Sequence, residues 1–254
     1  MNPELPFALR NKTIMVTGSA SGIGRCTAIA CAMAGAKLIL ADINEEGLKE
    51  TLSLLKTENC IQNHEIRVAD LSTDEGLTAL IDTLSILDGV VFCAGIGITK
   101  TIPFYSREDF YRVFDINFFA PVLLTKLLVK KKKLSKVSSL VYLVSVAGVF
   151  SFKPGNGIYG ASKSALHGFV KFAALELAAK GIRCNAVCPA MVETPFLQTV
   201  SLSQEDIEND KKKYPFKRYA QPEEIAQGCV FLLSDASSYM TGQDLVLDGG
   251  RLLN

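Results

Sequence analysis

The sequence predicts an α/β protein built on one doubly wound sheet of seven parallel strands, with helices on both faces. Short apolar runs rich in Val, Ile and Leu alternate along the chain with helical segments. The runs show little polar alternation, which is typical of parallel strands buried on both faces. Alternating strands and helices of this kind form a parallel sheet between helical layers. The predicted strands are residues 13–16, 37–41, 65–69, 89–93, 140–145, 183–187 and 244–247.

The segments between these strands carry helix signals. Helices are expected over residues 23–34 and 44–56, and Asn44 is the predicted N-cap of the second because two glutamates follow it in the first turn. No linker, repeat or low-complexity block interrupts the 254 residues. Residues 1–254 are therefore expected to form a single domain.

The composition does not favour a strongly charged partner. The chain has 27 basic and 26 acidic side chains, so neither nucleic acid nor a charged membrane is favoured as a partner. No run reaches the ~18 apolar residues of a membrane span, and the N-terminus lacks a signal-peptide core. Seven scattered cysteines and only two histidines indicate buried thiols in a reducing cytoplasm and no metal site.

Four consecutive lysines at residues 130–133 follow an apolar helical segment. Positive charge suits a solvated helix C-terminus, because the helix dipole is negative there. A docking site for an acidic partner is the alternative interpretation.

A glycine-rich loop follows the first predicted strand and precedes a helix. Gly18 allows a sharp turn off the strand, Gly22 lets backbone approach a pyrophosphate, and Gly24 lets the helix pack closely on the sheet. The helix N-terminus then presents free N–H groups to phosphate. The spacing G-x3-G-x-G is a weak signal alone, but its place between strand and helix predicts a Rossmann-type dinucleotide site that also includes Ser21 and Ile23.

Asp42 ends the second predicted strand, 18 residues past Gly24. A carboxylate there accepts hydrogen bonds from the ribose hydroxyls of NAD and repels the 2′-phosphate of NADP. The next residues, Ile43 and Asn44, bring no cation, so the sequence predicts NAD. Alternatively, Asp42 only starts a turn. Two further strand ends are expected against the cofactor, namely Asp70 with Leu71 and Cys93 with Ala94 and Gly95.

Tyr159 and Lys163 are spaced to share one helix face. A phenol titrates near pH 10, and a neighbouring ammonium lowers that pKa. The pair is thus expected to act as an acid/base catalyst near neutral pH.

Together these motifs resemble the short-chain dehydrogenase/reductase family in its compact form, over nearly the whole chain and in the family's order. The motifs that carry the resemblance are residues 17–24, Asp42, Asp70, residues 93–95, Asn117, Ser145, Tyr159 with Lys163, residues 189–194 and residues 248–250.

The resemblance implies a role for each member of a catalytic set. Tyr159 would exchange a proton with the substrate oxygen, which Ser145 would hold and polarise. Lys163 would bind the nicotinamide ribose and lower the pKa of Tyr159, and Asn117 would anchor a water of the proton relay. Val192 and Thr194, with Pro189, would hold the cofactor so that it delivers the pro-S hydride.

Four features depart from the family pattern. Cys93 stands where the family usually has Asn, and Ala190 stands where it usually has Gly. Ser145 and Tyr159 are 14 residues apart, where 13 is more usual, and residues 70–88 are some residues short.

The resemblance implies an oxidoreductase that transfers a hydride between NAD(H) and a secondary alcohol or ketone, a small-molecule substrate. A 3-oxoacyl-carrier-protein reductase is the alternative within the family, although Asp42 argues against that group's usual NADPH. A non-catalytic NAD(H)-binding sensor or scaffold is the alternative outside it, and it has no need of the catalytic set. A sugar-nucleotide epimerase would need a larger C-terminal part than the 60 residues after Thr194.

The predicted substrate region is mostly apolar, which predicts a substrate with an apolar body. Residues 193–220 are expected to form a loop over the substrate, within which 201–213 fits either a mobile lid or an exposed helix. The expected lining residues are Val146, Val149, Phe150, Phe152, Ile158, Met191, Phe196 and Leu197.

Two apolar segments predict self-association. The helix that carries Tyr159 continues through Phe169, Phe172, Leu175 and Leu177, and residues 102–128 are also apolar. In the family these helices pair between subunits, which implies a homotetramer, with a dimer as the fallback. Burial of both helices within one subunit is the alternative.

Overall fold

The computed structural model describes residues 6–58, 60, 62–199 and 203–253. A single parallel sheet of seven strands, in the order β3-β2-β1-β4-β5-β6-β7, forms the centre of this part of the chain, as predicted. The strands are β1 (Thr13–Thr17), β2 (Lys37–Asp42), β3 (Glu65–Val68), β4 (Leu87–Phe92), β5 (Leu134–Leu143), β6 (Arg183–Pro189) and β7 (Asp244–Leu247). The α-helices are α1 (Gly22–Met33), α2 (Glu45–Thr57), α3 (Asp74–Asp82), α4 (Arg107–Phe114), α5 (Ala120–Lys130), α6 (Gly157–Leu177), α7 (Gln204–Lys211) and α8 (Pro222–Leu233).

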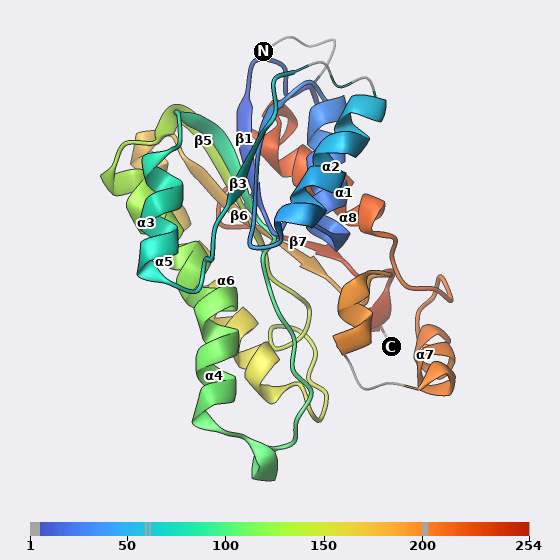
Figure 1. Cartoon of the computed structure of the whole chain (residues 1–254). Coiled ribbons are helices and arrows are strands. Elements are labelled where there is room, and N and C mark those ends of the chain that lie inside the picture. Colours follow the sequence, from blue (N-terminus) through green and yellow to red (C-terminus); the bar gives the residue numbers. More distant parts are fainter. Residues whose placement is uncertain (1–5, 59, 61, 200–202, 254) are drawn as a thin grey trace.

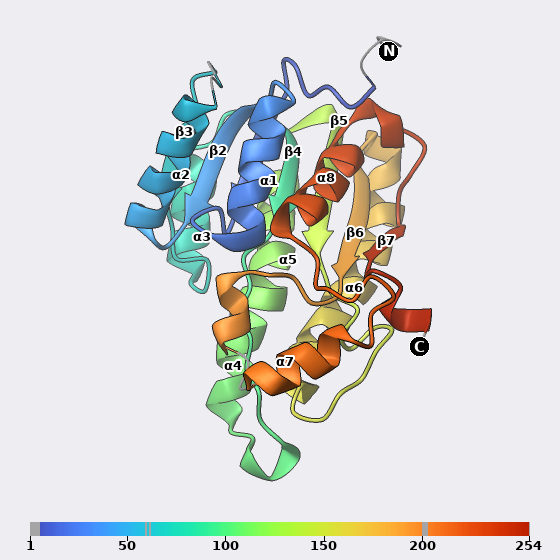
Figure 2. The same ribbon diagram turned by 90° about the vertical axis from the view of Figure 1, so that its right-hand side faces the viewer.

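Helices cover both faces of the sheet. Figure 2 shows α1, α2 and α8 on one face, and Figure 1 shows α3, α5 and α6 on the other. Each layer has its own apolar core: one cluster joins the sheet to α1, α2 and α8, and the other joins it to α3, α5 and α6. This is the doubly wound Rossmann-like arrangement that the strand pattern predicts.

Strand β5 corrects the predicted boundaries. It begins at Leu134 and ends at Leu143, whereas the apolar pattern predicts 140–145. Residues 136 and 137 are exposed, so the first part of the strand carries no apolar signal, although Leu134 pairs with Leu87. Because β5 ends early, Ser145 lies in the loop beyond the sheet edge.

Two other segments of the sequence analysis, residues 201–213 and the lysines at 130–133, are associated with helices in the structure. Residues 204–211 form α7, which Ser203 and Asp206 start with a capping box, so an exposed helix accounts for the described part of 201–213. Its function as a lid stays a prediction, and residues 201 and 202 lie outside the described part. Helix α5 ends at Lys130, so the four lysines lie at a helix C-terminus as predicted, and Lys131 is ion-paired with Asp82.

The topology fixes where a ligand can bind. From β1 the chain builds outward to β2 and β3, and β4 returns to the other side of β1. In open parallel sheets a ligand crevice forms outside the carboxyl ends of the strands at such a switch point. No helix in the described ranges has both the length and the apolar character of a membrane span.

Candidate active site

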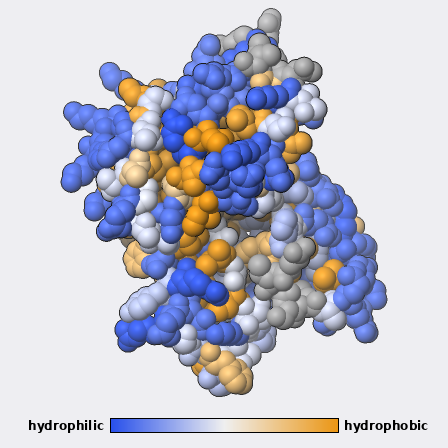
Figure 3. Space-filling view, in the orientation of Figure 1, coloured by the Kyte–Doolittle hydropathy of each residue, from blue (hydrophilic) through white to orange (hydrophobic). Residues whose placement is uncertain are grey.

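A cavity of about 440 Å³ opens at the carboxyl edge of the sheet. Its walls come from the loops that follow β1 to β6, together with α6 and the segments around α7. Figure 3 shows hydrophobic residues gathered along the middle of one face of the molecule, bordered by hydrophilic ones. The residues predicted to contact the cofactor line it together: Gly18, Ser21, Gly22, Ile23, Gly24, Asp42, Asp70, Leu71, Cys93, Ala94, Gly95, Tyr159, Lys163, Pro189, Val192 and Thr194.

 All sixteen residues predicted to contact the cofactor therefore line this one cavity, and Ser145 lines it with them.

The glycine-rich loop has the geometry that a dinucleotide pyrophosphate needs. Gly18 and Gly22 have positive φ angles of 69° and 52°, and a Cβ on Gly24 would lie 2.0 Å from the Gly18 carbonyl oxygen. A Cβ on Gly18 would lie 2.7 Å from the Ala94 nitrogen, so side chains are excluded at Gly18 and Gly24, and the positive φ disfavours one at Gly22. Helix α1 begins at Gly22 without a side-chain cap from Ser21, which leaves its N-terminal N–H groups for an anion. These residues fit the phosphates of a dinucleotide.

Asp42 is held at the rim of the cavity by backbone. One carboxylate oxygen accepts from the Ala20 N–H at 3.1 Å, and the other accepts from the Asn44 N–H at 3.0 Å. Asp42 therefore does stabilise a turn, as the alternative interpretation expects. Each carboxylate oxygen can accept more than one hydrogen bond, so the ribose function is compatible with this geometry.

The two candidate cations, Arg25 and Lys49, are engaged with other carboxylates. Arg25 donates to Glu50 at 2.8 Å and to Thr51 at 3.0 Å. Lys49 is ion-paired with Glu45 and Glu46 on its own helix. Arg25 also donates to the carbonyl oxygens of Ala20 and Gly47.

The strand ends after β3 and β4 complete this side of the cavity. Asp70 accepts hydrogen bonds from the backbone and hydroxyl of Ser72, and these lower the pKa of its carboxyl. The Ala94 N–H donates to the Thr17 hydroxyl at 3.3 Å, which ties the two loops together. A Cβ on Gly95 would lie 3.3 Å from Asn117 Oδ1 and 3.6 Å from Lys163 Nζ.

Asn117 lies in a π-helical turn, Asp115–Phe119, between α4 and α5. Such turns occur often at functional sites. Its amide nitrogen donates to the Ile96 carbonyl and to the Ser162 hydroxyl, both at 3.0 Å, and its oxygen accepts from the Ile96 N–H at 2.9 Å. The side chain therefore fixes the loop after β4 against α6.

Lys163 is a buried cation beside Tyr159. Its ammonium donates to the Leu143 carbonyl at 2.7 Å and lies 5.8 Å from the centre of the Tyr159 ring. Burial lowers the pKa of Lys163 to about 8. Helix α6 brings both side chains to the cavity, as their spacing predicts.

The predicted pKa direction for Tyr159 is wrong. Burial raises the pKa of Tyr159 to about 12, and only the hydrogen bond with Ser145 acts to lower it. The ammonium of Lys163 faces the Leu143 carbonyl, so desolvation of the phenol outweighs its effect. Ser145 also accepts from the Ala147 N–H at 3.1 Å, which orients its hydroxyl group.

Half of the predicted apolar lining residues line the cavity. Val146, Met191, Phe196 and Leu197 line the cavity, and the Phe196 ring lies 5.7 Å from that of Tyr159. The other four expected lining residues do not line it. The chain turns away at Gly148, whose φ of 81° packs it against α6, so that Phe152 is 79% exposed while Ile158 joins the buried residues.

Several polar side chains in the lining were missed from the sequence, among them Lys153, Tyr214 and Arg251. Lys153 lies between Ser145 and Tyr159 in the chain, and Arg251 directly follows the Asp248–Gly250 motif. Their place beside motif residues was the available signal.

The chain matches known proteins over almost all its length. The family model described as Enoyl-(Acyl carrier protein) reductase matches residues 18–251. A 3-oxoacyl-[acyl-carrier-protein] reductase of Rickettsia bellii is 35% identical over 245 residues, which cover 96% of this chain and 98% of that protein. Dehydrogenase/reductase SDR family member 6 of Rattus norvegicus is 33% identical, over 95% of this chain and 98% of that protein.

Solved structures are similar over the same range. A putative NAD(P) dependent gluconate 5-dehydrogenase from Beutenbergia cavernae, with bound NADP, superposes with a TM-score of 0.90 at 30% identity. The match covers 98% of this chain and all of that one.

Proposed function

The chain belongs to the short-chain dehydrogenase/reductase family, and from that premise we propose that it transfers a hydride between NAD(H) and a secondary alcohol or ketone, with Tyr159 as acid and base. The observation that carries the proposal is the convergence of Ser145, Tyr159 and Lys163 on the cavity that the glycine-rich loop opens. Asn117 adjoins them through Ser162 and Gly95.

A nicotinamide cofactor supplies the hydride donor or acceptor. Ser145 holds the substrate oxygen, since its hydroxyl lies within hydrogen-bond reach of Tyr159. With a pKa of about 12, the Tyr159 hydroxyl is protonated at neutral pH and is ready to donate its proton to a carbonyl oxygen as that oxygen gains negative charge. Oxidation of an alcohol returns the proton to Tyr159. Lys163, held on the Leu143 carbonyl, presents positive charge to this site and to the nicotinamide ribose.

We further propose NAD(H) as the coenzyme, because Asp42 lies at the rim of the cavity and the candidate cations Arg25 and Lys49 are paired with glutamates. NADP in the Beutenbergia cavernae protein belongs to that protein, and its presence makes the coenzyme choice here a direct question for measurement.

A screen tests the oxidoreductase proposal. NADH absorbance should fall with at least one ketone of a broad panel, and NAD should be reduced with the corresponding secondary alcohol. The set of four catalytic side chains supports turnover over the sensor or scaffold hypothesis. Coenzyme binding without turnover of any alcohol or ketone would favour the sensor instead. Turnover of acyl-carrier thioesters alone would favour a 3-oxoacyl-carrier-protein reductase, the function named for the Rickettsia bellii relative.

We propose a homotetramer, with a dimer as the fallback. On α6, Phe172 and Leu175 are 66% and 77% exposed, and Phe119 is also exposed where the π-helical turn meets α5. Phe169 and Leu177 pack into the subunit's own core, so only part of the predicted stripe is available to a partner. Light scattering at micromolar concentration should give the mass of four chains, or of two. A monomer would contradict the proposal.

The cellular location is proposed to be cytoplasmic. All seven cysteines are free thiols in the structure, four of them buried, as is usual for a reducing compartment.

A further inference from the structure

One fully buried hydroxyl beside the catalytic group takes no part in the proton transfer itself. Ser162 directly precedes Lys163 on α6, three residues after Tyr159, and its side chain is 0% exposed. It is not among the described residues that line the cavity, so it contacts neither coenzyme nor substrate directly. Any effect of Ser162 on the reaction must therefore pass through its neighbours.

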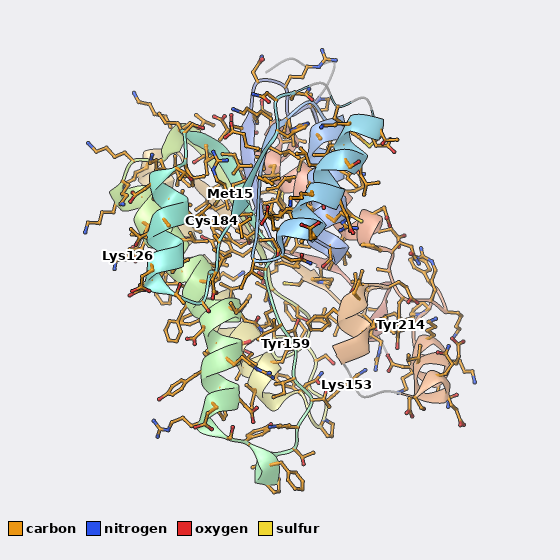
Figure 4. The ribbon with its side chains drawn as sticks, in the orientation of Figure 1. Met15, Lys126, Lys153, Tyr159, Cys184 and Tyr214 are labelled. Carbon is orange, nitrogen blue, oxygen red and sulfur yellow. The ribbon has the colours of Figure 1, made fainter. Side chains whose placement is uncertain are left out.

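The Ser162 hydroxyl joins two of the predicted catalytic residues. It donates to the Tyr159 carbonyl oxygen at 2.7 Å and accepts from the Asn117 amide nitrogen at 3.0 Å. A hydroxyl has one hydrogen, so with that hydrogen on Tyr159 it meets Asn117 as an acceptor. Figure 4 shows Tyr159 below the carboxyl edge of the sheet, with α4 on one side and Tyr214 on the other.

Asn117 continues this link to the coenzyme side of the cavity. Its amide exchanges two hydrogen bonds with the backbone of Ile96, and both Ile96 and Gly95 line the cavity. Lys163 lies on the other side of Gly95 from the Asn117 amide oxygen, close enough that a Cβ on Gly95 would be in contact with both. The loop after β4, the π-helical turn and α6 are thus joined through one amide and one hydroxyl.

Burial means that the link cannot be replaced by bulk water. Asn117 is buried as deeply as Ser162. Without the Ser162 hydroxyl, the second N–H of the Asn117 amide would be left in the interior without its acceptor, which is unfavourable for a buried polar group. The amide would still bind Ile96, but its tie to α6 would be lost.

Granted the oxidoreductase function above, we propose that Ser162 is a positioning residue for the reaction and that it acts through Asn117. It fixes the loop that lines the coenzyme side of the cavity against the helix that carries Tyr159 and Lys163. Hydride and proton transfer need the coenzyme and the phenol in one geometry, and a misplacement of ~1 Å can cost ~100-fold in rate.

Ser162→Ala removes the hydroxyl and tests this positioning. We expect kcat with a substrate from the screen to fall by about tenfold, because the reacting groups are less well placed. The dissociation constant of NADH, from a fluorescence titration, should change much less, since the glycine-rich loop is untouched. Ser139→Ala is the matched control and should keep the parent's kcat. Ser139 is a buried serine on β5 whose hydroxyl donates to the Leu232 carbonyl at 2.7 Å, outside the cavity.

A double-mutant cycle separates positioning through Asn117 from a merely structural role. Ser162→Ala should lower kcat by about tenfold in the parent but by much less in an Asn117→Ala background, where the amide that it positions is already absent. If thermal unfolding shows that Ser162→Ala or Asn117→Ala does not fold, Ser162→Cys and Asn117→Ser take their places.

The outcomes separate this role from the proposed function. A parental kcat in Ser162→Ala overturns the positioning role while the oxidoreductase proposal stands. An equal loss of kcat in Ser139→Ala has the same meaning, and so does the same fold-loss from Ser162→Ala with and without the Asn117 amide. A parent protein that turns over no alcohol or ketone overturns the proposed function and the role of Ser162 with it.

Discussion

Tyr159→Phe is expected to lower kcat by about a hundredfold or more, because proton transfer by a positioned side chain contributes ~10²–10⁴ to the rate. The substitution removes only the hydroxyl. The ring keeps its contact with Phe196 and its place over Lys163, so NAD(H) affinity should change little. Steady-state kinetics with any substrate from the screen, together with a fluorescence titration of NADH, measure both quantities.

Tyr111→Phe is the control for this substitution. Tyr111 is an exposed tyrosine on α4 that accepts a hydrogen bond from Arg107, outside the cavity. Its variant should keep the parent's kcat. Near-normal turnover in Tyr159→Phe would remove Tyr159 from the reaction, and a parallel loss of NADH binding would indicate a damaged fold instead.

Much of the cofactor side of the site could be predicted from the sequence, because its residues stand at the ends of parallel strands. Such ends meet at one edge, so a motif placed just after a strand is placed at the site. Gly18 follows β1, Asp42 ends β2 and Cys93 follows β4, and all three line the cavity. Tyr159 and Lys163 were predictable for the same kind of reason, since helical spacing alone puts them on one face.

The substrate side could not be predicted in the same way. Its residues come from irregular loops, where periodicity says nothing about direction. The turn at Gly148 sends Phe152 out to solvent, and Lys153 lines the cavity one residue later. The predicted direction of the Tyr159 pKa shift was wrong for a related reason. Its net shift depends on how deeply the ring is buried, and spacing gives only the neighbouring charge.

The second large effect is expected at Asp42. The protein should prefer NAD over NADP by at least tenfold and up to several hundredfold in kcat/KM. Like charges at ~4 Å repel by about 1 kcal/mol per unit pair in water, and by more in a partly buried cleft. Loss of the ribose hydrogen bonds adds about 1–3 kcal/mol for a charged acceptor. Together these terms give the expected ratio.

The structure sharpens this prediction, because the preference would fail if a cation neutralised the 2′-phosphate. Arg25 is bound to Glu50, and Lys49 is bound to Glu45 and Glu46, so recruiting either one means breaking an existing ion pair. The exposed pairs of Lys49 are worth only about 0–1 kcal/mol, which makes their rearrangement inexpensive. Arg25 is held more firmly, because it also donates to Thr51 and to the carbonyl oxygens of Ala20 and Gly47. The repulsion by Asp42 itself therefore has to carry the preference.

Asp42→Ala removes that repulsion and should raise kcat/KM for NADP relative to NAD by about tenfold or more. The N–H groups of Ala20 and Asn44, which the carboxylate now binds, would become available to the 2′-phosphate. Glu75→Ala, which removes an exposed carboxylate on α3 outside the cavity, should leave the ratio of the two coenzymes unchanged. The measurement is kcat/KM for both coenzymes with one substrate in the parent and in each variant. Equal efficiency in the parent, or no relative gain for NADP in Asp42→Ala, would show that Asp42 does not set the coenzyme choice.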